Sequence, residues 1–184
     1  MTVETTPIEG LLILKPVIHG DERGYFFESY NKLNLEANGH VRINFSQDNQ
    51  ARSVKNVLRG LHYQNEPSPQ TKLIRVLEGR IWDVAVDIRK HSKTYKKWFG
   101  IELSAENKLQ LLIPHGFAHG YAVLSDTAEV FYKCDNYYNK SAEGGIFFGD
   151  AEIAIDWKIN THEAIISEKD LKQPMLKDAW NAFE

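Results

Sequence analysis

Residues 72–89, KLIRVLEGRIWDVAVDIR, decide the fold class of this chain. Two β-type segments, Lys72–Leu77 and Arg80–Ile88, flank the turn pair Glu78-Gly79, and this spacing predicts a β-hairpin. The second segment alternates two sets of side chains, WVVI on one face and IDAD on the other. A period of two is typical of a strand, so one face of this segment is predicted to lie on a core.

The rest of the chain repeats this pattern of short β-type segments separated by turn residues. Gly10–Lys15 and Tyr25–Tyr30 flank a turn at residues 21–24. Further strands are predicted at Trp98–Leu103, Gln110–Ile113, Gly120–Leu124 and Ala128–Cys134. Helical pattern is confined to Lys32–Asn38 and Ser167–Leu171, where Ser167 and Asp170 are spaced like a capping box. The pattern favours an all-β sandwich or barrel, and 184 residues without a linker or repeat predict a single domain over residues 1–184.

Composition and charge exclude several classes of protein. The chain has 42% hydrophobic and 26% charged residues, which is ordinary for a globular protein. Its net charge is −3 and its one basic run, Arg89–Lys97, is interpreted as a solvated loop, so no nucleic-acid partner is expected. The apolar run Leu11–Leu14 is too short for a signal peptide or a spanning helix, so no membrane partner is expected. The single cysteine, Cys134, is predicted to be a packed thiol and favours a reducing, cytoplasmic location.

Three strand-like stretches are unusually rich in polar and aromatic groups: Gln47–Gln64, Ile113–Leu124 and Val130–Tyr138. A strand that only packs has little use for such groups, because burying them unpaired costs free energy. The stretches therefore indicate either a ligand-filled barrel mouth or a network of mutual hydrogen bonds.

Successive motifs of the chain resemble those of the dTDP-4-dehydrorhamnose 3,5-epimerases, in one order and spacing over nearly its whole length. They are DERGYFFE (21–28), QDN (47–49), VLRGLHYQ (57–64), KLIRVLEGRIWDVAVDIR (72–89), LSAENKLQLLIPHGFAHGYAVLS (103–125), YKCDNYY (132–138) and SEKD (167–170). The resemblance implies a cupin, that is, an all-β double-stranded β-helix or jelly roll with a few short helices. It also implies a role in dTDP-L-rhamnose biosynthesis.

Cupins often bind a metal through a His-x-His pair, a downstream Glu and a third His. Here His62 is followed two residues on by Gln64, and only His119 matches the later histidine. Two imidazoles without a carboxylate make a poor site, because open catalytic metal sites usually present three protein ligands. We therefore expect chemistry without a metal or another cofactor, as the resemblance also implies.

The reaction implied by the resemblance inverts C3 and C5 beside the C4 ketone of a dTDP-linked 6-deoxyhexose. Removing such a proton leaves an enolate, and a histidine base is weaker than this carbanion by on the order of a dozen pK units, or ~16 kcal/mol. The site must therefore supply a base on one face of the sugar, a partner for the enolate oxygen, and an acid on the opposite face.

Four residues are predicted to carry these roles. His62 in GLHYQ matches the base, since imidazole is neutral yet competent near pH 7. Asp170 resembles the carboxylate that fixes the tautomer of the base, as in catalytic triads. Tyr132 matches the proton donor, and Lys72 matches the cation beside the enolate oxygen. Without the resemblance, Asp170 would be interpreted as a capping acid, Tyr132 as a packing aromatic and Lys72 as a solvated lysine.

Further residues match positions that hold the nucleotide sugar. Arg59 and Arg23 suit a bidentate grip on phosphate oxygens. Other matches are Glu28, Gln47, Asn49, His119, Glu143 and Lys169, with Phe26 and Tyr138 as stacking aromatics. The resemblance also implies a homodimer in which strands within residues 1–30 reach into the partner subunit's site.

Arg59 and His62 are three residues apart, so a regular strand would direct them to opposite faces. Both reach one ligand only if the strand bulges or twists between them, and Gly60 is best suited to permit this. We therefore predict an irregularity at residues 59–61.

Three other functions compete with this interpretation. A mono-epimerase or isomerase of a related 4-keto sugar nucleotide would use the same acid and base. A metal-dependent cupin such as a dioxygenase is disfavoured by the missing ligands. A non-enzymatic module that binds sugar nucleotides would show affinity without proton exchange.

Overall fold

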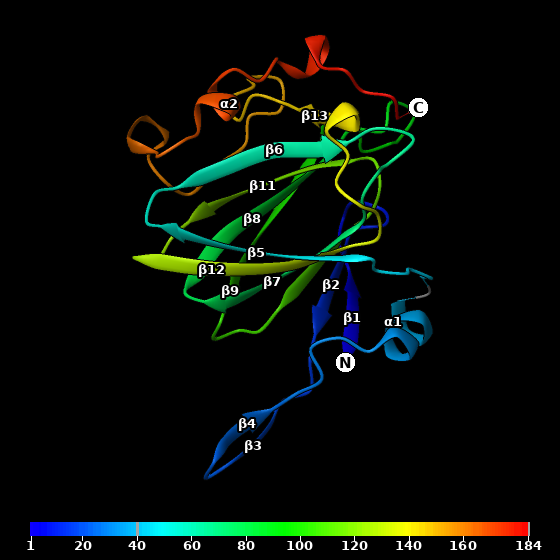
Figure 1. The fold of residues 1–184 in the computed structure, drawn as a ribbon, viewed down its shortest axis with the longest axis vertical. Helices are drawn as coiled ribbons and strands as arrows, with labels where there is room; N and C mark the ends of the chain where they lie inside the picture. Colours follow the sequence, from blue (N-terminus) through cyan, green and yellow to red (C-terminus); the bar gives the residue numbers. More distant parts are fainter. Residues whose placement is uncertain (40, 184) are drawn as a thin grey trace.

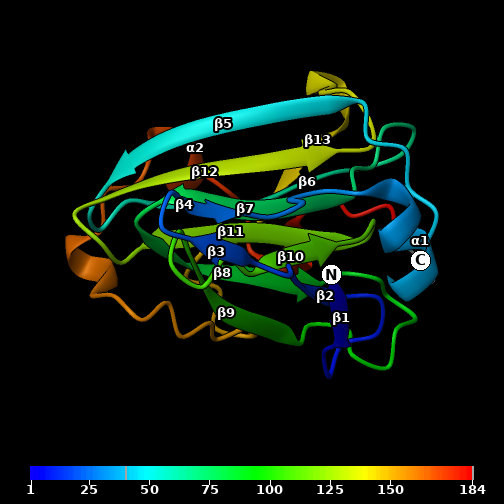
Figure 2. The same cartoon turned by 90° about the horizontal axis from the view of Figure 1, so that it is seen from below.

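The computed structural model describes residues 1–39 and 41–183, and within these ranges the strands form two large antiparallel sheets and a separate pair (Figures 1 and 2). The six-stranded sheet has the order β1 (Thr2–Thr5), β2 (Leu12–Lys15), β10 (Gln110–Ile113), β7 (Lys72–Glu78), β12 (Thr127–Cys134), β5 (Gln47–Val54). The five-stranded sheet has the order β13 (Glu143–Gly145), β6 (Leu58–Gln64), β11 (Phe117–Val123), β8 (Arg80–Asp87), β9 (Trp98–Ser104). The pair is β3 (His19–Asp21) with β4 (Gly24–Phe26). The predicted all-β jelly roll is confirmed.

Helical structure in the described chain is short, as predicted. The two α-helices are α1 (Lys32–Gly39) and α2 (Glu168–Leu171), and three 3₁₀ turns span Lys140–Ala142, Thr161–Glu163 and Leu176–Asp178. Ser167 caps α2 by accepting a hydrogen bond from the Asp170 N–H at 3.1 Å. None of these helices is long and apolar enough to cross a lipid bilayer.

The prediction of a hairpin at Glu78-Gly79 is wrong in its pairing. Strands β7 and β8 have nearly the predicted bounds, but β7 pairs with β10 and β12, whereas β8 pairs with β11 and β9. Gly79, with φ +72°, carries the chain from one sheet to the other. Alternation within a strand reports which faces are buried and does not report the partner strand, so a local pattern fits both connections.

The second sheet is buried on both faces. On the inner face, Ile81 and Ala85 of β8 lie in the core between the sheets. On the outer face, Val84 and Val86 of the same strand pack with Trp157 from the C-terminal segment, which lies over this sheet in Figure 1. Only one face was predicted to lie on a core. The second face is buried because residues 146–183, with little regular structure, cover it.

The outer face of the first sheet is covered in part by α1. Leu35, the buried residue of this helix, packs with Leu12, Leu14, Leu73 and Leu112 from three strands of the sheet. Burying a leucine side chain contributes ~1.5–3 kcal/mol, so this contact fixes the helix to the sheet.

The N-terminal turn differs from its prediction. The strand before residues 21–24 is β3, rather than Gly10–Lys15, and the strand after it ends at Phe26 rather than Tyr30. Strands β3 and β4 form an arm that projects from the body of the molecule (Figure 1). Its Phe26 is 68% exposed. Elsewhere, the predictions of a loop at Arg89–Lys97 and of a packed thiol at Cys134 are confirmed.

Candidate active site

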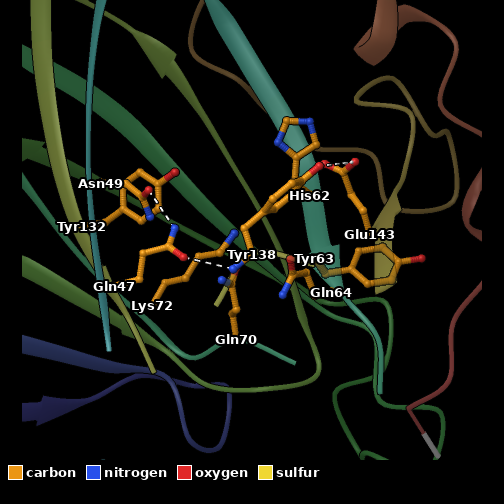
Figure 3. Close-up of a pocket in the computed structure, with 10 residues that line it drawn as sticks. All are labelled: Gln47, Asn49, His62, Tyr63, Gln64, Gln70, Lys72, Tyr132, Tyr138 and Glu143. Carbon is orange, nitrogen blue, oxygen red and sulfur yellow. Dashed lines mark hydrogen bonds between the residues drawn. The ribbon is translucent and has the colours of Figure 1, made fainter. Parts of the chain in front are cut away.

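A polar pocket of about 350 Å³ opens between the two sheets (Figure 3). Its walls come from both sheets and from the loops at their ends. The lining residues are Gln47, Asn49, His62, Tyr63, Gln64, Gln70, Lys72, Tyr132, Tyr138 and Glu143. Three of the four predicted catalytic side chains, His62, Lys72 and Tyr132, therefore line one cavity. The fourth, Asp170, does not line it but contacts His62.

His62 and Asp170 form a close pair between β6 and α2. The Nε2 atom of His62 lies 2.5 Å from Oδ1 of Asp170, and the residue Asp170 is 3% exposed. The second carboxylate oxygen accepts the Gly60 N–H at 3.4 Å. Burial raises the pKa of Asp170, but the hydrogen bonds from His62, Gly60 and Ser167 and the charge of His62 outweigh it and hold the pKa below its ordinary value. The aspartate is therefore ionised at neutral pH.

Strand β6 is irregular between Arg59 and His62, as predicted. Gly60 has φ +119°, a Cβ there would lie 2.6 Å from the Gly120 Cα, and the register against β11 shifts at this point. As a result, Arg59 and His62 line one depression together with Lys169 and Asp170. Regular alternation would have separated them.

Lys72 and Tyr132 belong to the first sheet and face His62 across the pocket (Figure 3). Burial lowers the pKa of Lys72, and Coulombic interactions with Cys134, Asp83 and Glu143 offset this only in part. Burial also raises the pKa of Tyr132 to about 12. The phenol thus stays protonated at neutral pH, while the ammonium loses its proton more readily than a lysine in water.

His119 lies beneath the pocket and does not line it. It faces His62 across the β6–β11 pair, is 8% exposed, and contacts Asp83 Oδ1 through Nε2 at 2.7 Å. Asp83 is fully buried. A second imidazole–carboxylate pair therefore supports the floor of the site.

The rim of the pocket is linked by polar contacts. Lys169 Nζ lies 2.5 Å from Glu143 Oε1, and the Tyr138 hydroxyl donates to Glu143 Oε2 at 3.3 Å. On the opposite side, Gln47 donates from Nε2 to Asn49 Oδ1 at 2.9 Å, and its Oε1 accepts the Tyr138 N–H at 3.0 Å. Five predicted binding residues thus form the rim of the pocket and the part of its wall that belongs to the six-stranded sheet.

Three predicted binding residues lie on the arm or just after it, away from this pocket in a single chain. Arg23 and Phe26 line a separate depression on the arm, and Arg23 forms an ion pair with Asp21 at 2.5 Å. Glu28 accepts hydrogen bonds from Asn31 and Asn34 just after the arm. The chain itself does not bring these side chains to His62.

Sequence reasoning missed three lining residues, Tyr63, Gln64 and Gln70. Gln64 was noted only as the residue that replaces a cupin metal ligand, and Tyr63 follows the predicted base directly. The available signal for Tyr63 and Gln64 was their position beside His62 in LHYQ, and Gln70 had no such signal. Among the described residues, no group of three or more His, Cys, Asp or Glu side chains gathers in a form that could hold a metal ion.

The fold and the pocket define an enzyme of the cupin class whose pocket is equipped for proton transfer. A family model described as dTDP-4-dehydrorhamnose 3,5-epimerase matches residues 5–178. The chain belongs to this family, and it is accordingly an isomerase.

Individual relatives agree with this assignment. The dTDP-4-dehydrorhamnose 3,5-epimerase of Shigella flexneri is 50% identical over 179 residues, which cover 97% of this chain and 98% of that protein. The crystal structure of the enzyme from Elizabethkingia anophelis NUHP1 has a TM-score of 0.93 at 50% identity and covers 97% of each chain. A dTDP-6-deoxy-D-glucose-3,5-epimerase from Legionella pneumophila Philadelphia 1, solved with dTDP-4-keto-L-rhamnose, has a TM-score of 0.92 at 45% identity over 96% of this chain and 93% of that one.

A related activity also occurs on this fold. A 3′-monoepimerase from Streptomyces bikiniensis, solved with dTDP-quinovose, has a TM-score of 0.87 at 29% identity, over 94% of this chain and 86% of that one.

Proposed function

We propose that the protein converts dTDP-4-dehydro-6-deoxy-D-glucose into dTDP-4-dehydro-L-rhamnose by inverting C3 and C5. The observation that carries the proposal is the pairing of His62 with Asp170 on one wall of a pocket whose other wall presents Tyr132 and Lys72. The ligand named for the Legionella pneumophila relative supports the choice of substrate.

In the first step, His62 removes the proton from the carbon beside the ketone. Because Nε2 contacts Asp170, Nδ1 is the nitrogen that accepts the proton. The electron pair of the C–H bond forms a double bond to C4, and the carbonyl pair moves onto O4. The Lys72 ammonium is the proposed partner of this oxygen, where fixed positive charge lowers the energy of the enolate.

In the second step, Tyr132 returns a proton to the opposite face. The enolate double bond takes the phenol proton, the C4 carbonyl re-forms, and Tyr132 is left as phenolate beside an imidazolium at His62. With a pKa of about 12, the phenol is still a far stronger acid than the sugar carbon, so the transfer runs downhill. Exchange with solvent then moves one proton from the imidazolium to the phenolate and resets the pair.

The nucleotide half of the substrate requires cations and flat side chains. Arg59 and Lys169 border the depression beside His62 and are the proposed contacts of the pyrophosphate. Tyr138, at the rim, is the proposed aromatic contact, and Gln47 and Asn49 are proposed to bind the sugar or base from β5. Glu143 completes the proposed set of pocket residues that contact the substrate, whereas His119, which does not line the pocket, is proposed to support the site through its pair with Asp83.

We propose that the arm of a second copy completes the site in a homodimer. Arg23, Phe26 and Glu28 lie away from the pocket of their own chain, and the Arg23 side chain is 86% exposed. A projecting hairpin with exposed aromatic residues is suited to contact another molecule. The site of one copy would then contain residues 23–28 of its partner.

The buried free thiol of Cys134 is consistent with a reducing compartment, and we propose a cytoplasmic location.

Incubation with the 4-keto substrate in heavy water tests the function directly. Deuterium at C3 and C5 of the product, followed by NMR, supports the double epimerase. Deuterium at one carbon supports a mono-epimerase, the activity named for the Streptomyces bikiniensis relative. Binding without any exchange would contradict an epimerase and leave a sugar-nucleotide binding protein.

A further inference from the structure

Gln64 stands in the wall of the pocket two residues after the proposed base (Figure 3). It belongs to β6 and pairs in register with Glu143 of β13. Although its side chain is polar, the residue is only 4% exposed. A buried amide is tolerated only when both its N–H and C=O groups find partners, so the partners of Gln64 reveal its role.

The amide of Gln64 binds main-chain atoms of two different loops. Its Nε2 donates to the Ser68 carbonyl at 2.6 Å and to the Tyr137 carbonyl at 3.2 Å. Its Oε1 accepts the Asn139 N–H at 2.8 Å. Because one amide both donates to and accepts from these loops, it holds residues 65–71 and 135–139 against the end of β6.

These two loops carry the rim. The first leads into β7, where Lys72 begins the strand, and the second contains Tyr138. Asn139 continues the linkage, because its side chain binds Ser68 Oγ and accepts the Ser141 N–H at the start of the 3₁₀ turn before Glu143. One buried glutamine thus links both loops that carry the rim.

We propose that Gln64 is a positioning residue that sets the rim for the nucleotide half of the substrate, acting through Tyr138 and Glu143. The inference rests on the proposed function of the same pocket. His62 contacts Asp170 of α2, which in turn accepts the Gly60 N–H, and the hydrogen bonds of the Gln64 amide go to other residues. The linkage through Gln64 is therefore separate from the one that orients the proposed base. Loss of the Gln64 amide should therefore weaken binding and leave proton transfer largely intact.

Asn65, the next residue, provides a matched control. It is a fully buried amide whose Nδ2 donates to the Trp180 carbonyl at 3.0 Å and whose Oδ1 accepts the Ala182 N–H at 2.8 Å. Like Gln64, it binds main-chain atoms of other segments, in this case from the first residue after β6. It differs because it binds the C-terminal segment instead of the rim.

The test compares Gln64→Met with Asn65→Leu by calorimetric titration with dTDP, steady-state kinetics and thermal melting. Losing two or more net hydrogen bonds at the rim should raise the dTDP Kd and the KM of Gln64→Met about tenfold or more, with kcat within about threefold of wild type. Asn65→Leu should lower Tm while keeping the wild-type Kd. A wild-type Kd in Gln64→Met, or a fall in kcat at unchanged KM, would overturn the inference.

Gln64→Glu provides a second test of the inference if the methionine variant does not fold. A carboxylate keeps the acceptor for Asn139 and repels the carbonyl oxygens of Ser68 and Tyr137, whereas the protonated acid restores one donor. The ratio of its dTDP Kd to that of wild type should therefore fall as pH is lowered from about 8 to about 5. A ratio that does not change with pH contradicts the proposal. If wild type binds dTDP but does not turn over the sugar nucleotide, the proposed function fails. The dTDP affinities of the variants still test whether Gln64 positions the rim.

Discussion

His62 presents Nε2, and not Nδ1, to Asp170, at 2.5 Å from the carboxylate. The ionised aspartate accepts the Nε2–H, so a neutral imidazole carries its proton on the nitrogen that faces Asp170 and leaves Nδ1 free to accept one. The tautomer of the proposed base is therefore set by a residue 108 positions away in the sequence.

Replacing Asp170 by Asn should disable the base without removing it. The amide of Asn donates to Nε2 and thereby favours the tautomer with its proton on Nδ1, which cannot accept one from the sugar. By analogy with the aspartate of serine proteases, kcat should fall by about 10³ to 10⁴. Single-turnover assays measure this, with Glu168→Gln on the exposed face of α2 as the control. An Asp170→Asn enzyme within tenfold of wild type would contradict this role.

His62→Ala and Tyr132→Phe should separate the two proton transfers. Loss of the base should abolish deuterium uptake at both carbons, whereas loss of the phenol should spare part of the proton abstraction and impair inversion. The comparison is made by NMR in heavy water, by following the substrate and product signals separately. Full exchange in the His62→Ala enzyme would show that another group is the base.

Deprotonation of Lys72 should cause the fall of kcat at alkaline pH, that is, the alkaline limb of the pH profile. Burial lowers the pKa of this ammonium below its ordinary value, so kcat should fall as pH rises, and it should do so before an ordinary lysine in water would lose its proton. Tyr132, with a pKa of about 12, titrates later. In Lys72→Arg the guanidinium keeps its charge, and the limb should move to higher pH even though altered geometry lowers the rate. Profiles of kcat from pH 7 to 11 decide this, and an unmoved limb would assign the titration to another group.

The shape of the site was predicted best where the periodicity of a strand could be combined with the position of a particular glycine. The separation of Arg59 and His62 required an irregular strand, and Gly60 supplies it with a backbone conformation that a side chain would obstruct. The same reasoning failed at Gly79, because the pattern of a strand does not reveal which strand lies beside it.

Other features depend on contacts between distant segments and carry no local pattern. Asp170 contacts His62 only because α2 packs against β6, and the sequence alone favoured a capping role. The cap itself is formed by Ser167, whose Oγ accepts the main-chain N–H of Asp170, whereas the Asp170 carboxylate contacts His62 and Gly60. The hydrogen bonds of Gln64 were missed because its partners are main-chain atoms, which any sequence provides.

The arm provides the last prediction, a complementation test of the proposed dimer. Arg23→Ala should damage each site through the partner's arm, and His62→Ala should damage each site through its own wall. When the two inactive homodimers are mixed and allowed to exchange subunits, half of the dimers are mixed, and each of these has one site with both residues intact, so activity should recover to about a quarter of wild type. The assay follows product formation after mixing, with each variant alone as the control. If both residues came from one chain, every site in the mixture would lack one of them, and no activity would return.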